Sequence, residues 1–154
     1  MGYTGYTIEE IEAGIIATLE AYEPLNYVRT FDRLPWHRAD ELEKLVKRYP
    51  ATLVAYIRGA DFTGNVSVCD HTGVFGVLCC GKNLRSPSAA LTGPEASEKG
   101  VYDMLDDVLS CLNYSDLGLN IMYCKSLRIV PLAASPSIGI FSREFEIKWR
   151  LTAT

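Results

Sequence analysis

Residues 141–151 read FSREFEIKWRL, and this stretch decides the fold. Its apolar side chains share one parity of the chain and its polar side chains share the other, apart from Arg143. The apolar set is Phe141, Phe145, Ile147, Trp149 and Leu151, and the polar set is Ser142, Glu144, Glu146, Lys148 and Arg150. A period of two predicts an antiparallel strand with one face on a core and a charged face in water.

An apolar strand face needs a second layer, and the chain contains three amphipathic helical patterns that could supply it. Thr7 and Glu10 form a capping box in front of the first helix, which is predicted over residues 8–22. A second helix is predicted over residues 40–49, capped by its first residue. A third is predicted over residues 94–112, with a proline in its first turn.

Further strands are predicted where apolar runs lie between turn residues. Residues 51–58 and 72–82 are apolar on both parities, so they read as two buried strands related as a hairpin. Weaker candidates are residues 27–31, 119–124 and 127–132. The segments 59–71 and 83–93 are predicted as long loops, the first with a minor strand as an option at residues 66–69. Long loops in a small domain are usually functional.

These elements predict an α+β fold, with a mainly antiparallel sheet of four to five strands and helices packed on one face. The whole chain, residues 1–154, is expected to form a single domain. Residues 2–7 are a doubled Gly-Tyr-Thr triplet, and we expect residues 1–6 to be a flexible lead-in.

Composition narrows the classes of function. The formal charge is -4 and the pI is about 5.2, which argues against a protein that grips nucleic acid. Five cysteines, two of them adjacent at Cys79 and Cys80, do not suit a disulfide framework, so reduced thiols in the cytosol are expected. No stretch approaches the roughly 20 apolar residues of a membrane helix, and no signal peptide is expected.

Candidate chemistry in the sequence is weak. Cys69, Asp70 and His71 are consecutive, but neighbours on an extended chain rarely point together, so a cluster without catalytic function is favoured. Adjacent cysteines on a strand face opposite ways, and the histidines and thiols lack zinc-ligand spacing. We therefore predict neither a metal nor a cofactor. Three carboxylates on the third helix are expected on its wet side; they are Asp103, Asp106 and Asp107.

Three segments carry a resemblance to a known family. They are ATLVAY at residues 51–56, VFGVLCCGKNLRS at residues 74–86 and GVYDMLD at residues 100–106. They resemble the core of a family encoded beside the sheath and tube genes of Mu-like contractile-tailed phages. The likeness covers most of the chain, from Ile8 to the final strand. Its motifs are core and turn residues, so no catalytic residue carries over.

That family is similar to the phage tail terminators, which are α+β proteins that assemble as a hexameric ring on the finished tail tube. The resemblance implies a structural protein, not an enzyme, at the head-proximal end of the virion tail, assembled in the host cytoplasm. Its implied partners are further copies of the chain, the tail tube and sheath proteins, and the head-tail connector protein. Genomic DNA would pass through the ring without specific binding, and no membrane is involved.

On this hypothesis the two long loops and their flanks provide protein interfaces. The candidate interface residues are Asp61, Phe62, Asn65, Asp70, His71, Lys82, Asn83, Arg85, Ser86 and Lys99. An alternative in the same class is a head-tail connector subunit. A less favoured alternative from another class is a small cytosolic cysteine-dependent enzyme that uses Cys69 or His71.

Overall fold

The fold is built around its last strand, β6 (Ile138–Ala153). A computed structural model describes residues 2–82, 91–92, 99–132 and 138–154. The remaining elements, in chain order, are β1 (Tyr3–Thr4), α1 (Ile8–Ala21), the 3-10 helix η1 (Glu23–Leu25), β2 (Thr30–Arg33), the 3-10 helix η2 (Trp36–Glu41), α2 (Leu42–Leu45), β3 (Ala51–Asn65), β4 (Val68–Lys82), α4 (Val101–Leu112) and β5 (Tyr123–Pro131).

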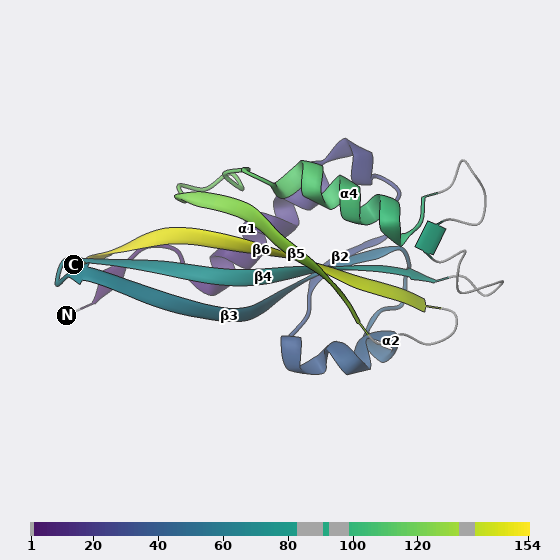
Figure 1. Cartoon of the computed structure of the whole chain (residues 1–154), viewed down its shortest axis with the longest axis horizontal. Coiled ribbons are helices and arrows are strands. Elements are labelled where there is room, and N and C mark those ends of the chain that lie inside the picture. The colour runs from purple at the N-terminus through teal and green to yellow at the C-terminus, as the bar shows by residue number, and fades with distance from the viewer. Residues whose placement is uncertain (1, 83–90, 93–98, 133–137) are drawn as a thin grey trace.

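The described residues form one six-stranded sheet in which β6 is flanked on both sides (Figure 1). One side of β6 pairs with β4, and the other side pairs with β5 and with the short β1. Strands β3 and β2 continue the sheet beyond β4. All pairings are antiparallel except β2 with β3. The predicted α+β class and mainly antiparallel sheet are confirmed, but four to five strands was too few.

The alternation of residues 141–151 works as predicted on its apolar parity. Phe145, Ile147 and Trp149 are fully buried under the helices α1 and α4. The Trp149 indole N–H donates to the backbone oxygen of Tyr6 at 2.9 Å, which satisfies the one polar group of that side chain. The polar parity was only partly predicted, because Glu144 is buried as well.

The sheet has two covered faces rather than one. The larger core lies between the sheet and the helices α1 and α4, above the strands in Figure 1. A second core lies on the opposite face, where Leu42 and Val46 of the α2 region cover Leu53 and Leu78. The prediction that all helices pack on one face was therefore wrong. A second helix was predicted, but it covers the apolar side chains of β3 and β4 that point away from α1 and α4.

The adjacent Cys79 and Cys80 also show that both faces of the sheet are covered. Cys79 belongs to the larger core and Cys80 to the second core, and both are fully buried. The prediction that they point to opposite faces is confirmed, and both behave as small apolar side chains.

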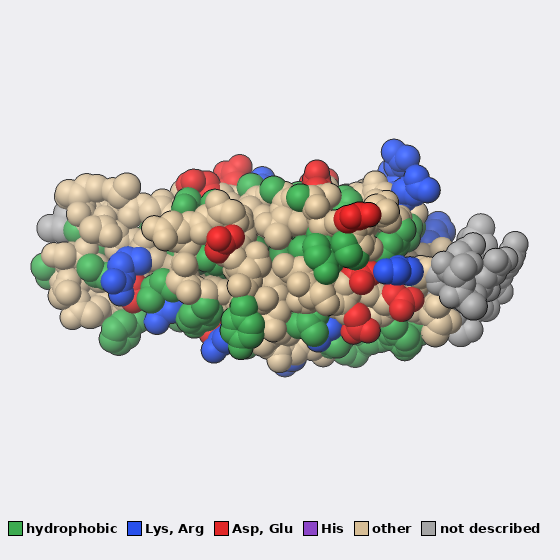
Figure 2. All heavy atoms as spheres, turned by 90° about the horizontal axis from the view of Figure 1, so that it is seen from above, with side chains coloured by type: hydrophobic (Ala, Val, Ile, Leu, Met, Phe, Trp, Pro, Cys, Tyr) green, Lys and Arg blue, Asp and Glu red, His purple; other side chains and the backbone are tan. Residues whose placement is uncertain are grey.

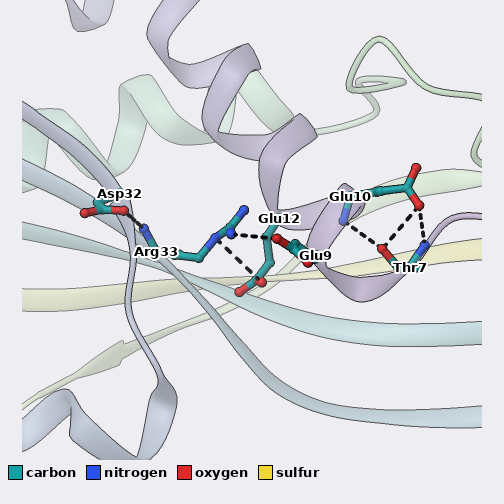
Figure 3. A network of polar contacts seen from close by, with 6 residues as sticks. All are labelled: Thr7, Glu9, Glu10, Glu12, Asp32 and Arg33. Atoms are coloured by element: carbon teal, nitrogen blue, oxygen red, sulfur yellow. Dashed lines mark hydrogen bonds and ion pairs between the residues drawn. The ribbon is translucent and has the colours of Figure 1, made fainter.

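The first helix begins where the capping box predicts (Figure 3). The hydroxyl of Thr7 accepts a hydrogen bond from the Glu10 backbone N–H, and the Glu10 carboxylate accepts one from the Thr7 N–H, both at 3.2 Å. Helix α4 starts later than predicted, at Val101, with Gly100 as its N-cap. The Asp103 carboxylate accepts the Gly100 N–H at 3.2 Å. The predicted start at residue 94 lies outside the described residues.

Several predicted boundaries were wrong. Residues 59–71 are not a loop, because β3 and β4 stay paired through them to a tight turn at residues 66–67. Their Gly, Asp and Asn content suggested a loop, but ladder hydrogen bonds join backbone groups and do not require apolar side chains. The two candidates at 119–124 and 127–132 are one strand, β5, with a register shift after Ser126.

Three shorter segments also differ. The second helix is a single turn of α-helix after a 3-10 helix, and it begins at Leu42 rather than at residue 40. The early strand lies at Thr30–Arg33, three residues later than predicted. Tyr3 and Thr4, expected in a flexible lead-in, form β1 against Ala153 and Thr152.

We predict that Ile147→Ala destabilises the fold by about 2–5 kcal/mol, because it removes a fully buried side chain and leaves a cavity in the larger core. Urea unfolding followed by far-UV circular dichroism measures the change. The matched control is Ile129→Ala on the neighbouring strand, where the side chain is 44% exposed and the expected change is within about 0.5 kcal/mol. Equal losses in the two variants would contradict this description of the core.

Candidate assembly surface

The outer part of the β3–β4 hairpin projects beyond the two cores. We call residues 58–74 the distal hairpin; it begins where the pairing of β3 shifts register between Tyr56 and Arg58. Every β3 residue from Arg58 to Asn65 is exposed. In Figure 1 this hairpin runs with β6 to the end of the molecule where both termini lie. Its β3 strand therefore lies at the surface, whereas Asp70, Gly73 and Val74 on its β4 strand are buried.

The distal hairpin has an open edge. The parallel partner β2 stops opposite Val54, and within the described residues the backbone of residues 55–65 is bonded only to β4. On this edge the Phe62 side chain is 68% exposed, and Val66 is exposed at the turn. Unpaired edges accept further strands, so natural proteins protect them or use them for assembly.

His71 is held on the helix-side face of the distal hairpin. Its Nδ1 contacts the Asp61 carboxylate, and its Nε2 lies 3.4 Å from the Tyr56 hydroxyl. The imidazole also packs on Trp149, with ring centroids 4.6 Å apart. Since both ring nitrogens are already engaged, neither is free to act as a base for Cys69, whose sulfur accepts from the Thr63 hydroxyl at 3.7 Å.

Asp70 lies on the opposite face of the hairpin and joins β4 to β6. Its two carboxylate oxygens accept from Nε and Nη2 of Arg150 at 2.7 and 3.0 Å, a bidentate pair. The hydrogen bonds from Arg150 hold the pKa of the Asp70 carboxyl below its ordinary value of 3.8. The pair joins the outer part of the hairpin to the final strand.

The structure brings half of the predicted interface residues together. Asp61, Phe62, Asn65, Asp70 and His71 all belong to the distal hairpin, with the Asn65 side chain accepting the Ser67 N–H at the turn.

The other predicted residues lie elsewhere. Lys82 is at the far end of β4, with its ammonium 5.8 Å from the Tyr49 ring centroid. Lys99 pairs with Asp107 at 3.0 Å in front of α4. Asn83, Arg85 and Ser86 lie outside the described residues. The hairpin residues and Lys82 therefore do not form one surface.

Sequence reasoning missed a cluster of ion pairs on the sheet face opposite α1 and α4. The buried Glu144 carboxylate lies 3.0 Å from Nε of Arg128 and 4.0 Å from Nη1 of Arg58. Next to it on β6, Glu146 accepts from the Tyr123 hydroxyl at 2.6 Å and contacts Lys125 at 3.2 Å. The residues of this cluster come from three strands, β3, β5 and β6, so no local pattern in the sequence could have found them.

Buried thiols are poor candidates for catalysis. Burial raises the pKa of Cys111 to about 11 and of Cys124 to about 12, and it also raises the pKa values of Cys79 and Cys80. Such thiols stay protonated near neutral pH, whereas nucleophilic cysteines need a lowered pKa. Among the described residues, no group of three or more His, Cys, Asp or Glu side chains could hold a metal ion.

A shallow hollow between α1 and the end of α4 offers no alternative site. Its walls contain no acidic, basic or histidine side chain. The lining residues are Ala17, Thr18, Ala21, Tyr22, Cys111, Leu117 and Gly118. Its only thiol, that of Cys111, donates to the Thr18 backbone oxygen at 3.6 Å.

Comparison with known protein families identifies the family of this chain. Residues 7–150 match the family described as "Bacteriophage Mu, Gp37". The match spans nearly the whole chain, so the protein belongs to the Gp37 family of bacteriophage Mu. The predicted resemblance to a family of Mu-like phages is confirmed. Comparison with curated proteins finds no match. No helix in the described part of the chain is long and apolar enough to cross a membrane.

We predict that Arg150→Gln destabilises the fold at pH 7 and has less effect at about pH 3. Folding lowers the pKa of Asp70, so the pair stabilises the fold above the ordinary carboxyl pKa and the stabilisation is lost as the pH falls through the folded value. Urea unfolding at the two pH values measures the difference. Lys47→Gln, at an exposed position after α2, is the charge-matched control, and an Arg150→Gln effect that does not shrink at low pH would contradict the prediction.

Proposed function

We propose that this chain is a structural tail protein of a Mu-like phage, a terminator that forms a ring on the finished tail tube. The ring stops further growth of the tube and provides the surface to which the head is joined. Its partners are further copies of the chain, the tube and sheath proteins and the head-tail connector. Genomic DNA passes through the ring without specific binding.

The open edge of the distal hairpin is the observation that carries the proposal. A strand with an unpaired edge and an exposed Phe62 promotes aggregation of a free protein, and the same edge can bind a neighbouring chain in an assembly. The hairpin contributes little to either core, so its length is better explained by contacts with other chains. Membership of a phage family adds support.

A ring of identical chains sets a geometric requirement. Each copy has to present two different surfaces, one to each neighbour, so that the contact is heterologous and the rotation closes. The open edge of β3 and the opposite side of the sheet, where β5 lies, are different surfaces in this sense. We propose a closed ring of six copies, as the similarity to tail terminators implies.

A phage that lacks this chain tests the proposal. Without a terminator we expect tails of uncontrolled length that are not joined to heads, and electron microscopy of the lysate measures both. Normal tails beside filled heads that lack a connection would instead indicate a head-tail connector subunit. Infectious particles of normal appearance would exclude both assembly roles.

We predict that Phe62→Ser fails to restore normal tails to that deletion phage, while the purified variant keeps its stability within about 1 kcal/mol. The reason is that Phe62 is exposed in the free chain and is available to a neighbouring one. Tyr114→Ser, which changes an aromatic residue 78% exposed in the turn after α4, is the matched control and should restore normal tails. Normal tails from both variants would remove Phe62 from the interface.

The rival enzymatic role is tested on the same phage. A chain that carries Cys69→Ser, and so keeps the candidate interface residue His71, should fold and restore normal tails if the protein acts only through its surfaces. Loss of particles with an unchanged fold would favour a role for the Cys69 thiol in chemistry.

A further inference from the structure

The sheet face opposite α1 and α4 carries a group of charged side chains that we call the basic face. Strand alternation and ion pairs place them together. The basic members are Arg58, Lys125, Arg128, Lys148 and Arg150, and the acidic members are Asp70, Glu144 and Glu146. Five basic and three acidic groups give this face a net charge of +2, although the whole chain carries -4.

Within the basic face the cations project and the carboxylates are recessed. The Glu144 side chain is only 2% exposed, whereas its partners Arg58 and Arg128 are 55% and 62% exposed. The same holds for Asp70 at 10% against Arg150 at 52%. A molecule that approaches this face therefore meets guanidinium and ammonium groups first.

The other side of the molecule has the opposite sign. Helices α1 and α4 contain seven acidic residues and no basic one. This acidic layer consists of Glu9, Glu10, Glu12, Glu20, Asp103, Asp106 and Asp107. Three basic side chains pair with this layer: Arg33 contacts Glu9 and Glu12 (Figure 3), Lys99 contacts Asp107 at 3.0 Å, and Arg143 lies 4.0 Å from Asp106. Seven acidic against three basic groups leave the layer with a net charge of -4, and the Glu9 and Asp106 side chains remain 78% and 84% exposed. Seen from above the helices, acidic and basic side chains both lie along the surface (Figure 2).

We infer that the basic face of one copy docks on the acidic layer of the next copy. Like faces repel and unlike faces attract, so the charges select a head-to-tail contact over a symmetric dimer. This inference rests on the proposed ring and adds a contact between faces to the one proposed at the open edge of β3.

A nucleic acid is the less favoured occupant of the basic face. Duplex DNA presents about one phosphate per 1.7 Å of its axis, and proteins that grip it gather many unpaired cations. Here three carboxylates lie among five cations, and the acidic layer would repel the same polymer. The acidic layer of a second copy offers discrete carboxylates in comparable number.

Charge reversal on purified protein tests the inference. One variant carries Glu20→Lys and Asp106→Lys on the acidic layer, a second carries Lys125→Glu and Lys148→Glu on the basic face, and a third carries all four changes. Sedimentation velocity at about 0.1 M and about 1 M salt measures self-association, because the Debye length falls from about 10 Å to about 3 Å over that range.

We expect the unmodified chain to assemble at low salt and to dissociate at high salt. Each double variant should lose at least about tenfold in association constant, and the fourfold variant should regain most of it, because reversing both faces restores opposite signs. Arg29→Glu, which lies next to Pro50, is a single charge reversal outside both faces and should leave association unchanged.

Assembly that is unaffected by the double variants would overturn the inference while leaving the ring itself in place, and so would a fourfold variant that stays dissociated but folded. An unmodified chain that remains monomeric at low salt would also overturn it, as would retention of duplex DNA by the basic face. The proposed function is judged separately, by the tails of the deletion phage. Thermal unfolding of each variant establishes that it is folded before it is compared.

Discussion

The pairing of β6 with β4 is the constraint on which the rest of the structure depends. It runs without interruption from Val68 opposite Thr152 to Lys82 opposite Ile138. Both helical layers, the β5 edge and the hairpin are attached to these two strands. Since β6 ends the sequence described and β4 lies in its middle, most stabilising contacts join distant parts of the chain. Such topologies fold slowly, because the entropy lost in closing long loops opposes folding before the long-range contacts form.

The features predicted correctly are those that follow from patterns of side chains along the sequence. The apolar parity of residues 145–149, the capping box at Thr7 and the opposite directions of Cys79 and Cys80 all follow from period and local hydrogen bonding. The extent of the hairpin did not follow, because residues 59–71 are held by backbone pairing that leaves no apolar period. The burial of Glu144 did not follow either, since its cover comes from Arg58 and Arg128 on two other strands.

The candidate assembly surface was likewise predicted only in part. Turn-forming composition drew attention to residues 59–71, and the structure does place Asp61, Phe62 and His71 on one exposed hairpin, although in a strand rather than a loop. The basic face could not be predicted from any pattern along the sequence, because its residues come from separate strands. On β6 the two functions are separated by parity alone: one set of side chains supplies stability and the other supplies charge. Substitutions on this strand therefore divide into two classes by residue number.

The register shift in β3 determines which of these classes its outer residues join. Before the shift, Leu53 pairs with Leu78 and faces α2; after it, Arg58 pairs with Val74 and reaches Glu144. Ile57 is the extra residue that makes this possible. Ile57 thus sets which face each hairpin side chain points to as far as Phe62, where a second register shift follows. Adding or removing matched pairs of residues in the distal hairpin preserves the direction of its side chains. A single insertion or deletion near Ile57 would instead exchange the side chains of its two faces.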